Sequence, residues 1–387
     1  MSLILLSLSL FTWGIGEGMF YIFQPIYLKE LGADTMTTAG ILSAFGFAMM
    51  LAHIPAGYLA DRIGRKPLLV AAWSTGMLAT WVMALANSLP IFVVGMLLYG
   101  LTAFVSAPMF SYVTAASGKL SPARAMTLTS AAFNLGAVLG PGIGGYLGEN
   151  FSLRFVYQVA AMIFVFSTFI LLFIRSQPRE IHDPSAPPPS LWTNQRYLGF
   201  LVVLFVSMLV MYLPQPLTPR FLQSERGLSL SAVGSIGVAG NFGNVVMNVV
   251  LGSLPARFGS LLAQGCVALF ALLMWIGTGQ PWYAVGYFLM GGYRAARPLY
   301  FAQIRAITHP SQMGIAYGLS ETVSSSTIVL APLLAGVLYD RDPVLVFPVS
   351  VGLILLSLAG AALFLPRQTV AEPPPLLYIP PESPFSD

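Results

Sequence analysis

Four ionisable side chains lie inside segments that are otherwise apolar: Glu17, Arg294, Arg297 and Glu321. Charge is costly in an apolar environment, so residues of this kind are candidates for binding or proton transfer. Counted at about 1.5 Å per helical residue, Glu17 and Arg294 lie near the middle of their segments, and Arg297 and Glu321 share a depth in neighbouring segments. A carboxylate in such a place can hold a proton, and an arginine can bind an anionic group.

Two interpretations of these four residues are open. In the functional one, Glu17 carries a proton under the influence of a nearby arginine, and Arg294 or Arg297 binds an anionic group on a substrate. In the structural one, Arg297 and Glu321 form an ion pair that only fixes the packing of two helices. We favour the structural interpretation for Arg297 and Glu321. For Glu17, which has glycines around it and no obvious partner on its own helix, we favour the functional one.

Uncharged polar residues extend the predicted site. Three asparagines recur at intervals of three and four residues, which puts them on one face of a helix. Such a stripe either lines an aqueous cavity or hydrogen-bonds to neighbouring helices, and the sequence favours neither. With polar residues of three other segments, they complete the predicted substrate-binding set, which is Tyr21, Gln24, Asn134, Gln215, Asn241, Asn244 and Asn248 together with Arg294 and Arg297.

The composition identifies the elements that hold these residues. Of 387 residues, 56% are hydrophobic and 8% charged, and the mean hydropathy is +0.78, whereas soluble domains have about 25% charged residues. The chain is therefore expected to be an all-α integral membrane protein. A helix needs about 20 apolar residues to cross a bilayer, and hydropathy predicts twelve such spans, at 4–28, 36–60, 67–87, 89–115, 122–148, 154–174, 197–222, 229–255, 260–279, 282–306, 312–339 and 344–365.

The sequence repeats itself at an interval of almost half its length. The segment 57–64 is echoed by 252–259 at an offset of 195, and 25–32 is echoed by 219–227 at an offset of 194 to 195. A proline-rich interval separates the two copies, and such sequence behaves as an extended spacer. The predicted organisation is an N-terminal six-helix bundle (1–175), a cytoplasmic linker (176–196), a C-terminal six-helix bundle (197–366) and a disordered cytoplasmic tail (367–387).

A charged, glycine-containing stretch between the second and third spans carries a family resemblance. Residues 57–66 read GYLADRIGRK, which resembles the loop between helices 2 and 3 of the major facilitator superfamily. The resemblance implies that Asp61 faces the amino terminus of the eleventh of the twelve spans, 312–339, and closes the cytoplasmic side. A helix amino terminus favours an anion. The alternative is a plain positively charged loop. By this resemblance the gating residues are Gly57, Asp61, Arg62, Gly64 and Arg65, and the second copy has Ala256 in place of the acid.

A second motif lies in the fifth span. Residues 136–145 read GAVLGPGIGG, which resembles the glycine and proline motif of drug-proton antiporters in that superfamily. Glycines allow close helix approach in lipid and Pro141 bends the helix, so Gly140 and Pro141 are also predicted gating residues. In the fourth span, Met96 stands where many proton-coupled exporters carry an arginine, which departs from their usual arrangement.

The resemblance implies a twelve-helix secondary transporter that works by alternating access and exports small amphipathic or drug-like molecules in exchange for protons. A transporter of organic anions, for uptake or export, is the alternative within this class, and a non-transporting membrane receptor is the alternative from another class. No cofactor, metal or nucleic acid is expected. The protein is expected to be a monomer. A single cysteine, Cys266, and three scattered histidines offer no metal site, and no nucleophile and base pair indicates an enzyme.

The basic residues predict the orientation in the membrane. If the amino terminus is cytoplasmic, eleven of the 18 lysines and arginines lie at inner ends of spans and five at outer ends. Cytoplasmic loops carry an excess of such residues. We therefore expect a multi-pass protein of the inner or plasma membrane with both termini in the cytoplasm.

Overall fold

The computed structural model describes residues 2–118, 120, 122–176, 191–304, 307–308 and 313–365. Within these ranges, the side chains of 53–63, 107, 110–111, 122–124, 192 and 313–315 are not described. Most of the predicted linker (177–190) and the predicted tail (367–387) therefore lie outside the described residues.

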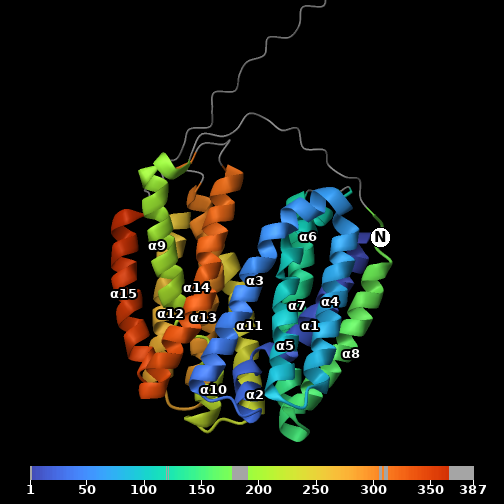
Figure 1. Cartoon of the computed structure of the whole chain (residues 1–387). Helices are drawn as coiled ribbons and strands as arrows, with labels where there is room; N and C mark the ends of the chain where they lie inside the picture. Colours follow the sequence, from blue (N-terminus) through green and yellow to red (C-terminus); the bar gives the residue numbers. More distant parts are fainter. Residues whose placement is uncertain are drawn as a thin grey trace, which may run out of the picture.

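All regular structure in these ranges is helical (Figure 1). In chain order the helices are α1 (Ser2–Tyr21), α2 (Gln24–Glu30), α3 (Thr35–Ile63), α4 (Arg65–Leu85), α5 (Leu89–Leu101), the 3₁₀ helix η1 (Thr102–Val105), α6 (Ser106–Ala115), α7 (Pro122–Asn150), α8 (Leu153–Leu172), the 3₁₀ helix η2 (Leu191–Thr193), α9 (Gln195–Tyr212), α10 (Thr218–Ser224), α11 (Leu230–Gly252), α12 (Ala256–Ile276), α13 (Gln280–Ile304), α14 (Met313–Arg341) and α15 (Val346–Phe364).

The predicted spans correspond to these helices, with three differences. Ten of the described helices are long and apolar enough to cross a membrane, and α13 and the segment α5–η1–α6 occupy the places of the other two expected crossings. The predicted continuous spans 4–28, 89–115 and 197–222 are wrong in detail, because each is interrupted. The first divides into α1 and α2, and the seventh into α9 and α10. Pro25 and Pro219 lie in the first turns of α2 and α10, where a missing N–H is tolerated, so the repeat in sequence is also a repeat of this break.

The helices form two bundles, α1–α8 and α9–α15 (Figure 1). In the first bundle α1 packs on α7 and α8, and in the second α13 packs on α11 and α12. The bundles meet through α7 against α11 and α3 against α14, and the short helices α2 and α10 also touch. The end of the molecule where α2 and α10 lie is called here the α2–α10 end, and α1 begins at the opposite end.

Helix α7 is close-packed on two sides. A Cβ added to Gly136, Gly140 or Gly144 would overlap backbone atoms of α1, and one added to Gly145 would lie 2.7 Å from the backbone oxygen of Leu230 in α11. Pro141 also contacts α11, at Gly234 and Gly237. The glycine and proline motif therefore lets α7 approach a helix of its own bundle and a helix of the other bundle at backbone distance.

Among the described residues, polar contacts between the bundles lie between the α2–α10 end and the middle of the long helices. Each joins a side chain to a backbone group or a hydroxyl of the facing bundle, so none of them is a pair of charges. They are Lys29 with Ser224 (2.7 Å), Arg220 with the Asp34 oxygen (3.1 Å) and the Thr38 hydroxyl (3.0 Å), Ser43 with the Val329 oxygen (2.7 Å), Glu149 with the Ser231 N–H (2.7 Å), the Ser231 hydroxyl with the Gly145 oxygen (3.5 Å) and Asn241 with the Ala137 oxygen (2.6 Å).

Candidate functional site

The Glu17 carboxylate is held by two donors inside the first bundle. The Tyr99 hydroxyl of α5 donates to Oε2 of Glu17 at 2.8 Å, and the Trp13 indole N–H donates to the same oxygen at 3.2 Å. Trp13 precedes Glu17 by four residues, so both lie on one face of α1. The expectation that Glu17 has no partner on its own helix is therefore wrong, because an indole N–H one turn away is such a partner.

Aromatic packing fixes the two donors. Trp13 is stacked on Phe164 of α8 at 4.0 Å between ring centroids with an angle of 6°, and it contacts Trp73 of α4 at 5.0 Å. Tyr99 lies edge-on to Phe20 at 5.5 Å and is 6% exposed. Neither Trp13 nor Tyr99 was among the predicted site residues. The interval of four before Glu17 could have indicated Trp13, whereas the contact with Tyr99 depends on tertiary packing.

Arg294 reaches the same region from the second bundle. It is exposed on α13, and its charge acts on Glu17 and Tyr21 of α1 and on Tyr212 of α9. Tyr212 is stacked on Tyr293, with 5.3 Å between their ring centroids. Arg294 therefore lies within electrostatic range of side chains of both bundles, in a mixed charged and aromatic environment.

The contact expected between Arg297 and Glu321 is present. The Arg297 guanidinium pairs with the Glu321 carboxylate, and the two side chains are 42% and 30% exposed. Arg297 also lies over the ring of Phe301, 5.9 Å from its centroid. The pair joins α13 to α14, and whether it acts only in packing stays a prediction.

The predicted asparagine stripe is engaged by helix backbones. Asn241 donates to the Ala137 oxygen of α7 at 2.6 Å, and Asn248 donates to the backbone and side-chain oxygens of Asn244, both at 2.8 Å. Asn134 donates to the Ser130 oxygen one turn earlier in α7 at 2.9 Å, and Gln215, in the turn after α9, donates to the Met211 oxygen of α9 at 2.7 Å. Of the two interpretations of the stripe, the contact of Asn241 matches hydrogen bonding to a neighbouring helix, whereas Asn248 is bonded within α11.

Two other predicted lining residues differ from each other in accessibility. Tyr21 is 36% exposed, whereas Gln24 is 2% exposed. The Nε2 atom of Gln24 is buried and has no hydrogen-bond partner among the described residues. Gln24 does not continue the face of Glu17, because α1 ends at Tyr21 and α2 begins at Gln24. The interval of seven residues after Glu17 predicts that Gln24 shares its helix face, and this prediction is wrong because it assumes an unbroken helix.

The charged segment resembling the superfamily loop is described only in part. The side chains of Gly57, Asp61 and Arg62 lie outside the described residues, so their predicted gating roles stay predictions. Gly64 has φ = +87° at the turn between α3 and α4, where a side chain would be strained. Arg65 follows as a buried residue of α4, 7% exposed. Gly64 of this motif therefore allows the turn between α3 and α4.

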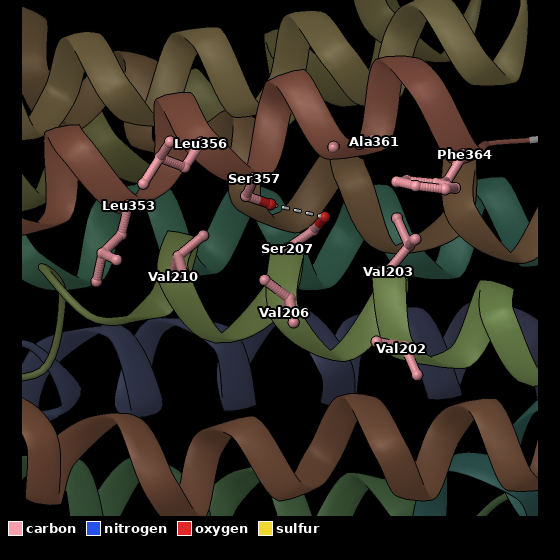
Figure 2. A pocket seen from close by; sticks show the side chains of 11 residues that line it. Val202, Val203, Val206, Ser207, Val210, Leu353, Leu356, Ser357, Ala361 and Phe364 are labelled. Carbon is pink, nitrogen blue, oxygen red and sulfur yellow. Dashed lines mark hydrogen bonds between the residues drawn. The ribbon is translucent and has the colours of Figure 1, made fainter.

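An apolar groove of about 280 Å³ lies elsewhere, between α9 and α15 (Figure 2). Val206 and Val210 line it from α9, and Leu353 and Phe364 from α15. Its two polar residues, Ser207 and Ser357, hydrogen-bond to each other at 3.1 Å. No ionisable side chain of the described residues lines the groove, so it is separate from the charged region around Glu17.

Two helical bundles with ionisable and aromatic groups between them are the architecture of a membrane transport protein. The chain belongs to the major facilitator superfamily, whose family model matches residues 6–332. It is therefore a multi-pass membrane transporter rather than an enzyme.

Curated relatives match the chain over most of its length. It is 26% identical over 346 residues to the class B tetracycline resistance protein of Escherichia coli, covering 85% of this chain and 86% of that protein. It is 23% identical over 389 residues to the quinolone resistance protein NorA of Staphylococcus aureus, covering 93% and 95%. It is 23% identical over 358 residues to multidrug resistance protein 2 of Bacillus subtilis, covering 88% and 89%.

Solved structures show the same fold at lower identity. The nucleoside transporter NupG, in a mutant form, superposes with a TM-score of 0.83 at 12% identity, over 94% of this chain and 100% of that one. The human organic anion transporter MFSD10 gives a TM-score of 0.66 at 16% identity, over 93% and 98%. These likenesses concern the fold.

Proposed function

We propose that this transporter exports small amphipathic or drug-like molecules in exchange for protons, with Glu17 as the proton carrier. The observation that carries the proposal is the position of Glu17, which is tied to Trp13 and Tyr99 in one bundle and faces the charge of Arg294 in the other. The Coulomb energy between Glu17 and Arg294 depends on the distance between them, so it changes when the bundles move relative to each other.

The relatives support export as the direction. They are named for resistance to tetracycline, to quinolones and to several drugs. Removal of a compound from the cell is the simplest way in which a membrane transporter gives resistance. The glycine and proline motif of α7, which includes Gly140 and Pro141, lies at the seam with α11, as a gating role requires.

Alternating access is supported by the polar contacts that join the bundles towards the α2–α10 end. We place the protein in the inner or plasma membrane as a monomer, with both termini in the cytoplasm, so the α2–α10 end is external. The polar contacts listed for that end then close the external side in this state. In the opposite state we expect Asp61, with Arg62 and Arg65, to close the cytoplasmic side.

Transport of an organic anion is the second candidate function. Arg294 is exposed, and the ion pair of neighbouring Arg297 is made with Glu321. A cation in such a position can bind a carboxylate or phosphate group by charge-assisted hydrogen bonds.

Reconstituted protein separates these functions. In proteoliposomes containing a pH-sensitive dye, addition of tetracycline to the wild type is expected to drive proton movement, and Glu17→Gln is expected to abolish it. Asp340→Asn, which changes an exposed carboxylate at the end of α14, is the matched control and should keep the wild-type signal. Unchanged proton movement in Glu17→Gln would remove Glu17 from the mechanism. Uptake of a labelled aromatic carboxylate that Arg294→Gln abolishes, without proton movement, would favour the second candidate.

A further inference from the structure

We infer that the transported proton binds at Oε1 of Glu17, and that Trp13 and Tyr99 are positioning residues that keep Oε2 as a hydrogen-bond acceptor. The inference rests on the proposed role of Glu17 as proton carrier. It goes further by assigning the two oxygens of one carboxyl group to different tasks.

The donors determine which oxygen stays unprotonated. Both described hydrogen bonds to Glu17 end on Oε2, from the Tyr99 hydroxyl at 2.8 Å and the Trp13 indole at 3.2 Å. An indole N–H can only donate, so Oε2 must offer a lone pair to Trp13 in every protonation state. A proton on Oε2 would leave one lone pair for Trp13 and would require the Tyr99 hydroxyl to turn from donor to acceptor. Oε1 receives no hydrogen bond from the described residues, so a proton can bind there without breaking either contact.

The site holds one oxygen of the carboxyl group and leaves the other free, because the donors themselves are fixed. The Trp13 indole lies between Phe164 and Trp73, at centroid distances of 4.0 and 5.0 Å. Gly76 of α4 makes room for it, since a Cβ there would come within 2.5 Å of the indole ring. Rotation of the carboxyl group by half a turn would only bring the other oxygen to the same fixed donors. One oxygen is therefore always held, and the other is always the free one.

The groups that act on Glu17 come from three helices. They are Tyr99 on α5, Trp13 on α1 itself and Arg294 on α13. The neighbouring helices α7 and α8 present apolar residues to this part of α1, namely Phe133, Ala137 and Phe164. Trp13 and Tyr99 belong to the same bundle as Glu17 and move with it, whereas Arg294 belongs to the other bundle. Relative movement of the bundles thus changes the field on the carboxyl group and leaves the hold on Oε2 unchanged.

Two variants test the positioning role through the pH profile of transport. Tyr99→Phe and Trp13→Phe each remove one donor that favours the ionised carboxylate, so Glu17 should release its proton less readily. The pH midpoint of tetracycline-driven proton movement should rise by roughly one unit in each variant, while turnover at the new optimum is retained. Tyr112→Phe is the matched control. It also removes a buried tyrosine hydroxyl from the first bundle, one that donates to the Arg175 oxygen, and its midpoint should equal that of the wild type.

Infrared difference spectroscopy tests the assignment of the atoms. In protonated Glu17 the carbonyl oxygen should be Oε2, which accepts two hydrogen bonds, so its C=O band should move to higher wavenumber in Tyr99→Phe and in Trp13→Phe. The band is identified by its absence in Glu17→Gln. If it stays in place in both variants, the proton is on Oε2 and the inference is overturned.

The outcome for the inference is separate from that for the proposed function. Loss of coupling in Glu17→Gln, with unshifted bands and midpoints in both aromatic variants, would reject the positioning role alone. Undiminished coupling in Glu17→Gln would reject the proposed function as well. Thermal unfolding of each variant identifies one that has failed to fold, and the remaining variant then decides.

Discussion

The Glu149 carboxylate at the end of α7 accepts a hydrogen bond of 2.7 Å from the backbone N–H of Ser231, in the first turn of α11. An acidic side chain of one bundle is thus bound to the amino terminus of a helix in the other. Helix amino termini attract anions because their first N–H groups lack partners and the helix dipole is positive there. This contact matches, at the α2–α10 end, what the superfamily resemblance implies for Asp61 at the other end.

Replacement of Glu149 should therefore favour opening at the α2–α10 end. We expect Glu149→Gln to raise the population of the open state by roughly threefold. Spin labels at Phe151→Cys and Trp282→Cys, in a Cys266→Ser background, would report the distance between the bundles. Asn150→Ala is the control, since Asn150 donates to the Tyr146 oxygen of its own helix. Identical distance distributions in Glu149→Gln and the wild type would show that the contact does not hold this end closed.

The pair of Arg297 and Glu321 should show coupling when both residues are changed. Arg297→Met or Glu321→Gln alone leaves one charge without its partner. The losses of stability in the two single variants should therefore add up to more than the loss in the double variant. Because both side chains are partly exposed, the coupling free energy should be about 1 kcal/mol. Thermal unfolding in detergent measures it. A double variant that is stable but does not transport would assign the pair to substrate binding instead of packing.

The close approach of α7 to α1 should fail when a side chain is inserted. In Gly144→Ala, the new Cβ overlaps the backbone oxygen of Met19, and we expect a loss of about 1–3 kcal/mol in unfolding free energy. Gly199→Ala in α9 is the control. A Cβ there meets nothing within 4 Å, and alanine favours a helix by up to about 1 kcal/mol over glycine. Equal melting temperatures for the two variants would contradict the close packing of α7.

Acid should remove a stabilising contact next to α3. The Asp34 carboxylate accepts a hydrogen bond of 2.7 Å from the Thr37 N–H, which lowers the pKa of Asp34 below its ordinary value of 3.8, with a smaller effect from Arg220. A pKa that is lower in the folded state stabilises the protein above the unfolded value, and this stabilisation is lost as the pH falls through the folded value. The melting temperature of Asp34→Ala should therefore be lower than that of the wild type by a constant amount between pH 5 and 8, and the difference should shrink below about pH 4. A difference that instead changes between pH 5 and 8 would assign the effect to another group.

The sequence predicted the helical membrane fold and the contact between Arg297 and Glu321, because both follow from local regularities. A long apolar segment can cross a bilayer only as a helix or a closed barrel strand, and two residues at one depth on neighbouring helices can meet. The breaks at Pro25 and Pro219 were missed because hydropathy does not report a short interruption inside an apolar segment.

The site itself was only partly predictable. Glu17 and Arg294 were found because charge is rare in these helices, and Tyr99 was missed because a tyrosine in an apolar helix is usually a packing residue. The asparagines of α11 show the same limit. Their spacing correctly placed them on one helix, but the choice between a cavity and a backbone oxygen depends on the facing helix, which for Asn241 is α7.

The glycines on opposite sides of α7 affect how fast the two bundles can move relative to each other. Where two helices meet backbone to backbone, no side chain of one fits between side chains of the other, so a small displacement does not require rotamers to change in concert. Gly145 and Gly234 form such a contact between the bundles. Sliding of the bundles along this contact should meet little friction. The slow step of the transport cycle is then expected to be the breaking of the polar contacts towards the α2–α10 end.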